Sequence, residues 1–354
     1  MPVARASLPE YINLGGQIVH PQPIKGEGMR LSGFLFESSP GPRQPGQPPP
    51  LQQLCNQALN SHPDRQLDYH VLGSHFILTF SDTARLSSAD NIGYVSELCT
   101  CFWLLALAVS RGPVRLPKYL SLYVPYIFVD NQYSAIGARE VYGFRKGLGE
   151  FRMPEDFSNP DWFTTSTLAF KTYSPQTRAE PQQLIELRRV DQPAKADARH
   201  QWDDHRQFFP QLIKTMLGHE AQALLHGMSE AVNVLEFEPK VSVPVTFIKQ
   251  FRDIEFNHQA CYQAIVEAHS RLLSTPKVGL LPGEYQLNVT HADSHPIDID
   301  LGVPSEGLTA KLAFWSEFDM LVETGKVIQS WPAVENNRGC LSFWFGRRRS
   351  SGRR

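Results

Sequence analysis

The sequence predicts an α+β protein with a mainly antiparallel sheet. Short runs of β-branched and aromatic residues recur along most of the chain, whereas helical spacing of apolar residues is confined to a few segments. Consecutive strands with few helices between them favour antiparallel pairing over a βαβ winding. The length of 354 residues would by itself allow two domains. The chain has no internal repeat.

The chain up to residue 129 carries four predicted strands, one helix and one loop. The strands are expected at 31–36, 71–80, 97–109 and 119–129, where Pro125 indicates an edge or a bulge. Residues 51–59 have helical apolar spacing. The stretch 40–50, PGPRQPGQPPP, predicts a surface loop that is too rigid and polar to join a core.

A compact helix is predicted at 131–141. Asp130 is suited to cap its start, and Gly143 is suited to end it. The glycine-rich sequence that follows cannot extend the helix, so residues 144–148 are expected to be extended. On an extended segment Phe144, Lys146 and Leu148 share one face, and Arg145 points to the other. Lys146 is therefore expected between two large apolar side chains.

The second half of the chain continues with strands and one helical segment. Residues 200–236 repeat apolar pairs at helical spacing, which predicts a helical insertion. Residues 346–354 form a basic tail that is expected to be disordered. Strands are expected at 162–173, 183–190, 241–251, 260–267, 285–289, 297–301 and 312–324.

Composition and charge exclude several classes of function. The formal net charge of -2 provides no general attraction for nucleic acid. The longest apolar run, 99–109, is shorter than the ~20 residues of a membrane helix, so no membrane partner is expected. The five cysteines form no C-x-x-C pair, and no signal peptide is evident, so a reducing cytoplasm is expected. His291, Asp293 and His295 favour a turn over a metal site, and no metal or other cofactor is expected.

The segment 130–150, DNQYSAIGAREVYGFRKGLGE, resembles the signature of the acetoacetate decarboxylase family. The matching positions are Asp130, Asn131, Ala138, Arg139, Glu140, Phe144 and Lys146. The resemblance implies that Lys146 is the lysine that forms a Schiff base. It also implies one domain over 1–345, in which a strongly curved sheet forms an open barrel or cone around the active site. The segments 40–50 and 200–236 are then insertions, and relatives suggest a homo-oligomer.

Two upstream segments are similar to further parts of the family's site. Residues 92–97, IGYVSE, place the family's active-site glutamate on Glu97, and residues 28–30 place its arginine on Arg30. The resemblance implies that Glu97 transfers protons and that Arg30 holds a substrate carboxylate. The side chains expected to line the substrate pocket are Phe144, Leu148, Phe76 and Tyr94.

These residue types suit the chemistry of an iminium intermediate. A lysine with an ordinary pKa near 10.4 is protonated at pH 7, but burial in an apolar site lowers that pKa and frees the amine. The amine condenses with a keto acid to give an iminium, from which a β-carboxylate leaves as carbon dioxide. The leading expectation is therefore a lyase without a cofactor that decarboxylates a β-keto acid.

Three departures from the family pattern keep other functions open. Gly147 stands where a second lysine is usual, Arg145 where a proline is usual, and Phe76 where a carboxylate is usual. The same iminium would also serve an aldolase or a dehydratase. A member that binds a small molecule without catalysis is the alternative from another class.

Overall fold

The computed structural model describes residues 11–12, 21–39, 41, 45–88, 90, 92–191, 212, 215–216 and 243–331. The expected loop at 40–50 is described from residue 45, together with residue 41. Of the expected helical insertion at 200–236, the described residues Leu212, Thr215 and Met216 are helical. The expected tail at 346–354 lies outside the described residues.

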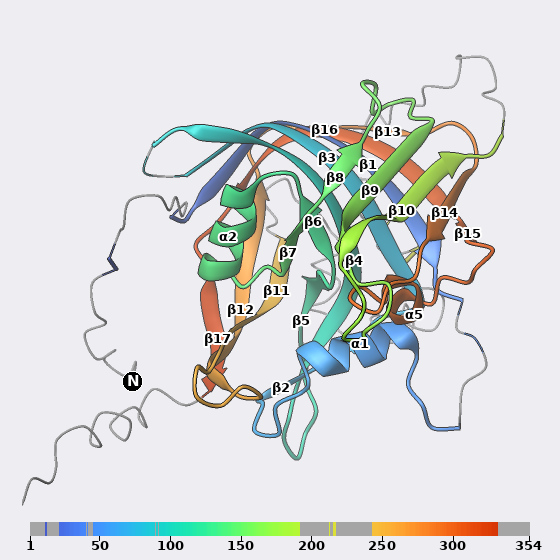
Figure 1. The fold of residues 1–354 in the computed structure, drawn as a ribbon. Helices are drawn as coiled ribbons and strands as arrows, with labels where there is room; N and C mark the ends of the chain where they lie inside the picture. The colour runs from blue at the N-terminus through green and yellow to red at the C-terminus, as the bar shows by residue number, and fades with distance from the viewer. Residues whose placement is uncertain are drawn as a thin grey trace, which may run out of the picture.

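The larger sheet returns on itself (Figure 1). Its path runs β16, β1, β3, β4, β5, β11 and β12, and β12 also pairs with β16, which closes a ring among the described strands. Neighbours along the path are antiparallel except β5 and β11, so the predicted α+β class with a mainly antiparallel sheet is confirmed. The ring strands are β1 (Ile24–Glu37), β3 (His75–Ser88), β4 (Tyr94–Ser110), β5 (Pro117–Tyr123), β11 (Val243–Arg252), β12 (Ala260–Leu272) and β16 (Leu312–Val322).

Shorter strands extend this sheet. β13 (Lys277–Leu280) pairs with β16, β17 (Lys326–Trp331) with β12, and β2 (Leu67–Val71) with β4. β6 (Ile127–Val129) pairs with β4 and, in parallel, with β7 (Lys146–Leu148). The expected strand 71–80 is divided because Gly73, with φ 74°, turns the chain between β2 and β3. The expected strand 119–129 is likewise divided around Pro125 into β5 and β6.

A second, smaller sheet packs on one face of the ring. It contains β15 (Leu308–Thr309), β14 (Tyr285–Val289), β10 (Glu180–Arg189), β9 (Trp162–Ala169) and β8 (Glu150–Arg152), in that order. Aromatic rings fill the interface, where Phe163 of β9 stacks on Phe80 of β3 with 4.4 Å between the ring centroids. Phe34 of β1 meets Phe163 edge to face at 5.9 Å. Each fully buried ring contributes about 1.5–3 kcal/mol to the free energy of unfolding.

The period of two along the strands gives the ring two distinct faces. On β3, Phe76, Leu78 and Phe80 belong to the aromatic core beneath the small sheet, while Ile77 and Thr79 line a cavity on the opposite face. This alternation decides which side chains of the ring can reach the cavity.

Three helices are described over their whole length. α1 (Pro50–Ala58) begins with proline at its first position and contacts α5 (Ile297–Leu301), and α2 (Gln132–Val141) lies apart from both (Figure 1). The expected strand at 297–301 is wrong, because the chain forms α5 there. Ile297 and Leu301, four positions apart, are buried, whereas Ile299 between them is 61% exposed. None of these helices is long and apolar enough to span a membrane.

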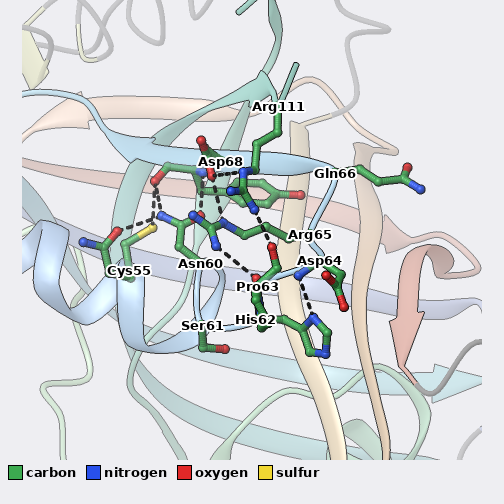
Figure 2. A network of polar contacts seen from close by, with 12 residues as sticks. Cys55, Asn60, Ser61, His62, Pro63, Asp64, Arg65, Gln66, Asp68 and Arg111 are labelled. Atoms are coloured by element: carbon green, nitrogen blue, oxygen red, sulfur yellow. Dashed lines mark hydrogen bonds and ion pairs between the residues drawn. The ribbon is translucent and has the colours of Figure 1, made fainter. Parts of the chain in front are cut away.

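A buried carboxylate joins the loop after α1 to the β4–β5 connection (Figure 2). Asp68 of β2 accepts a hydrogen bond from Arg65 Nε at 2.8 Å and lies 3.7 Å from Arg111 Nε. It also forms an ion pair with Arg115. The arginines lower the pKa of Asp68 below its ordinary value, against the desolvation that would raise it. This network fixes the end of the ring beside α1.

Candidate active site

Lys146 is placed by a short β6–α2–β7 crossover. β6 and β7 are parallel, with Ile127 opposite Lys146, and α2 makes the connection between them. β6 also pairs with β4, where Cys101 is opposite Ile127. Lys146 therefore starts β7, which is separated from β4 by the single strand β6. Its side chain extends toward the cavity face of β4.

Asp130 and Asn131 anchor the start of α2 to β4. Asn131 is the N-cap, because its side-chain oxygen accepts from the Ser134 backbone N–H at 2.8 Å. Its amide donates to the Ser96 carbonyl at 3.0 Å. The expected cap, Asp130, instead accepts from the Leu98 backbone N–H at 3.0 Å. The pair thus holds the first turn of the helix beside the strand that carries Glu97.

Gly143 ends the helix, as its position predicts. It has φ 90°, and a Cβ there would lie 2.6 Å from the Cα of Lys249. Glycine therefore allows the chain to turn back close to β11 and to present Phe144 and Lys146 to the cavity.

Lys146, Glu97 and Ser134 form a closed set of polar contacts. Lys146 Nζ donates to Glu97 Oε2 at 2.9 Å and to Ser134 Oγ at 2.6 Å. The Ser134 hydroxyl donates to the same Glu97 oxygen. Lys146 is 8% exposed and Glu97 7% exposed, so the ion pair is largely shielded from water. Three elements, β7, β4 and α2, each supply one member.

Glu97 reverses the expected shift in the pKa of Lys146. Burial lowers that pKa, but the Glu97 carboxylate raises it by charge and by hydrogen bonding, and the pKa lies above its ordinary value. The expectation of a depressed pKa is therefore wrong for the unliganded site. Burial also raises the pKa values of Cys99 and Cys101, which keeps these neighbouring thiols neutral at pH 7. At rest Lys146 is an ammonium ion paired with a carboxylate.

Lys146 and Glu97 open onto a cavity of about 570 Å³. Its walls are side chains from the inner face of the ring together with Phe144, Tyr133 and Ser134. Among the described lining residues, Lys146 and Arg271 are the cations and Glu97 is the carboxylate. Leu212 and Met216, four positions apart in the expected helical insertion, are buried and also line the cavity.

Arg30 does not reach this cavity. Its neighbours on β1, Met29 and Leu31, line the cavity, and the strand alternation turns Arg30 to the other face. There it pairs with Asp82, and its Nη1 donates to the Glu155 carbonyl at 2.9 Å. The structure thus places Arg30 away from Lys146. The expectation for Arg30 missed this because the register of β1 was not visible in the local sequence.

The four expected pocket side chains divide in the same way. Phe144 lines the cavity, with its ring centroid 5.7 Å from Lys146 Nζ. Phe76 is fully buried in the aromatic core, 5.6 Å from the Phe36 ring. Leu148 is 53% exposed, and Tyr94 is 55% exposed against the guanidinium of Arg85. These last three side chains are absent from the described lining of the cavity, so their expected place is corrected.

Neither sequence neighbour of Lys146 supplies a second cation to the cavity. Arg145 is exposed and is not among the described lining residues. A Cβ on Gly147 would point to the Phe128 ring, 3.3 Å away, rather than toward Lys146. The ion pair with Glu97 is therefore the main electrostatic influence on Lys146.

Ser134 is the side chain beside Lys146 and Glu97 that the sequence reasoning missed. It lies inside the motif around Lys146, and one signal was available: it is a hydroxyl on the face of α2 that also carries Ala135 and Gly137. That face of small residues brings the helix close to the ring. No group of three or more His, Cys, Asp or Glu side chains in the described chain is arranged to hold a metal ion.

The fold is similar to that of known enzymes, although the sequence gives no match. No family model matches the chain, and no curated protein matches it. Acetoacetate decarboxylase from Legionella pneumophila superposes with a TM-score of 0.51 and 13% identity, over 94% of this chain and 93% of that one. A second acetoacetate decarboxylase structure gives 0.50 and 10% identity, over 90% and 97% of the two chains. At these identities the comparison shows the fold.

Proposed function

We propose that this chain, which has the fold of acetoacetate decarboxylase, is a lyase that acts on a β-keto acid through a Schiff base on Lys146. The observation that carries the proposal is the buried contact of Lys146 with Glu97 and Ser134 at the wall of a cavity. A buried ammonium beside a carboxylate is costly to maintain, and a lysine amine, a proton acceptor and space for a carbonyl compound are what imine chemistry requires.

Glu97 provides the means to free the amine. A ligand that fills the cavity displaces water, which weakens the solvation of both charges and favours transfer of the ammonium proton to Glu97. The contact of 2.9 Å between Lys146 Nζ and Glu97 Oε2 allows this transfer without movement of the chain. Ser134 touches both groups and can relay the proton.

The proposed reaction balances with one proton taken from solvent. Lys146 as an ammonium and the substrate ketone give an iminium and water. The carbon–carbon bond to the carboxylate then breaks and carbon dioxide leaves. The electron pair of the broken bond moves into the iminium and gives an enamine. Glu97, protonated from solvent, delivers the proton to the enamine carbon. Water then hydrolyses the resulting iminium, which releases the ketone and restores the Lys146 ammonium.

One observation favours a second candidate, a protein that binds a small molecule without turning it over. The ion pair with Glu97 raises the pKa of Lys146 and so holds the lysine in its protonated, unreactive form. In this candidate the cavity takes the ligand, and the ion pair only orients it.

Reductive trapping separates the two candidates. The protein is incubated with acetoacetate, longer β-keto acids and pyruvate, reduced with borohydride, and mapped by mass spectrometry. We expect an adduct on Lys146 and release of carbon dioxide from the β-keto acids. An adduct without carbon dioxide would favour aldolase or dehydratase chemistry. No adduct with any of these acids, in folded protein that binds them, would establish the binding protein.

Two variants control the trapping experiment. Lys277→Ala removes an exposed lysine that pairs with Glu317, and it should leave trapping unchanged. Lys146→Ala should abolish trapping, but it leaves the Glu97 charge buried without its cation, which costs about 3–5 kcal/mol. The double variant Lys146→Met with Glu97→Gln removes both charges and should also be inactive while remaining folded.

A further inference from the structure

We infer that the substrate carries a long apolar chain, so that a β-keto acid with an extended alkyl tail, rather than acetoacetate itself, fits the cavity. This inference rests on the proposed Schiff-base function and names its substrate class. Three observations support it. They are the volume of the cavity, the apolar side chains at the end distant from Lys146, and the hydrogen bonds that several wall hydroxyl groups already make within the protein.

The cavity is too large for a small keto acid. Its volume of about 570 Å³ falls within the roughly 300–1,000 Å³ of pockets that hold ligands the size of drugs. Acetoacetate at Lys146 would leave most of this space unfilled. Glu97 and Leu105 both face the cavity from β4, and the strand between them covers up to about 26 Å at about 3.3 Å per residue.

The two ends of the cavity differ in their surroundings. Near Lys146 the wall belongs to a cluster that includes Cys101, Ile127 and Phe144. The other end belongs to a second cluster that includes Leu105, Leu120, Leu212, Met216 and Phe314. Trp103 and Leu122 pack against both clusters and so connect them. A ligand whose carbonyl reaches Lys146 can therefore extend a chain along Trp103 into an aliphatic end.

Several hydroxyl groups of the wall are already hydrogen-bonded within the protein. Thr79 Oγ1 accepts from Trp103 Nε1 at 2.9 Å, and Ser316 Oγ donates to the Lys277 carbonyl at 3.0 Å. Ser121 Oγ is 2.5 Å from Thr246 Oγ1. These groups offer little to a polar ligand, so the surface that a ligand meets is largely apolar.

The charged side chains of the wall also favour a ligand whose chain is apolar. Of the two cations in the described lining, Arg271 is paired with Glu323 and its side chain is 43% exposed, whereas the Lys146 side chain is 9% exposed. Lys146 is therefore the cation that is shielded from water at the cavity wall. The carboxylate of a β-keto acid lies next to its carbonyl and can pair with the nitrogen of Lys146 itself. The remainder of the substrate meets apolar walls, which favour an uncharged hydrocarbon chain.

A series of substrates tests this inference. Decarboxylation is measured for β-keto acids from acetoacetate to 3-oxododecanoate, with borohydride trapping in parallel. We expect kcat/KM to rise by up to about fourfold for each added methylene until the cavity is full. Equal or better turnover of acetoacetate would overturn the inference and leave the proposed function intact. If no acid forms an adduct while a long-chain methyl ketone still binds in calorimetry, the proposed function fails and the apolar-chain site remains.

Matched substitutions locate the chain in the cavity. Leu105→Phe fills the end distant from Glu97, and it should lower the ratio of long-chain to short-chain kcat/KM by about tenfold or more. Leu120→Phe provides a second variant in case the first does not fold. Leu168→Phe, at a position that is 62% exposed and outside the described lining, should leave the ratio unchanged. An unchanged ratio in folded Leu105→Phe and Leu120→Phe proteins would exclude this end of the cavity as the chain site.

Discussion

The ion pair of Lys146 with Glu97 and the proposed chemistry require opposite protonation states of Lys146. The ion pair stabilises the ammonium, yet nucleophilic attack requires the neutral amine. Both requirements are met if Glu97 is the base that takes the proton when a ligand enters. The resting pair then protects a reactive amine until the cavity is occupied.

The variant Glu97→Gln should separate these two effects. Loss of the carboxylate leaves burial as the main influence on Lys146, so the pKa of Lys146 should fall below its ordinary value of 10.5. Turnover should nevertheless decrease by about 10²–10⁴, because the proton donor and acceptor is absent. The pH dependence of borohydride trapping and of carbon dioxide release measures the two effects. A trapping profile identical to that of the wild type would show that Glu97 does not control the Lys146 pKa.

Ser134 should act by positioning rather than by stability alone. In Ser134→Ala, Lys146 and Glu97 each lose one hydrogen bond, at a cost of about 1–3 kcal/mol. We expect kcat to fall about tenfold with little change in KM, and Ser134→Thr to recover part of the loss. If KM rises and kcat is unchanged, Ser134 contacts the substrate instead of orienting the pair.

The start of helix α2 is anchored to β4, which fixes the position of Ser134 relative to Glu97. Its N-cap residue, Asn131, bonds both to the helix and to the Ser96 carbonyl, one residue before Glu97. The helix is short, and isolated helices of this length are marginal in water, so these bonds and its packing determine its placement.

Asn131→Ala should therefore reduce both stability and activity. The lost cap costs about 1 kcal/mol of the free energy of unfolding, and the displaced first turn should lower kcat. Denaturant unfolding and the decarboxylation assay measure the two losses. Gln132→Ala is the matched control, because Gln132 is an exposed first-turn residue on the same helix. Equal effects of the two substitutions would argue against a role for the cap.

The limits of helix α2 were accessible from local sequence, whereas the parallel pairing of β6 and β7 was not. Helix 131–141 was predicted to within one residue of α2, and Gly143 ends it as expected, because caps and positive-φ glycines are local signals. The strand predicted at 297–301 failed because the alternation Ile-Asp-Ile-Asp-Leu also fits a single helical turn with Ile297 and Leu301 buried. A segment that short has no periodicity that separates the two structures.

Across the larger fold, the ring and the small sheet leave an aromatic core on one face and the cavity on the other. The Asp68 network holds the ring at the end beside α1 (Figure 2). Because Asp68 is buried and its arginine partners lie on two separate loops, its charge stabilises the arrangement of those loops.

The variant Asp68→Asn should be less stable by about 1–3 kcal/mol at neutral pH, since hydrogen bonds to a charged group are lost. In the folded protein the pKa of Asp68 lies below its ordinary value of 3.8. The ionised carboxylate therefore contributes fully to the free energy of unfolding above pH 3.8. As the pH falls through the folded pKa, the contribution is lost. The stability difference between wild type and variant, measured by urea unfolding across acid pH, should therefore shrink below pH 3.8. A difference that stays constant or grows with acid would contradict the ionised, paired state of Asp68.

The local sequence of this protein predicted much of the ring strands and the central helix, because propensity, caps and alternation act over a few residues. The resemblance of residues 130–150 to a known family singled out Lys146. The partners of that lysine depend on contacts between distant segments. Tertiary structure turned Arg30 outward, placed Ser134 against Glu97, and raised the Lys146 pKa instead of lowering it. It also assembled a long apolar cavity from strands spread over the chain, since which face of each strand points inward depends on register and closure.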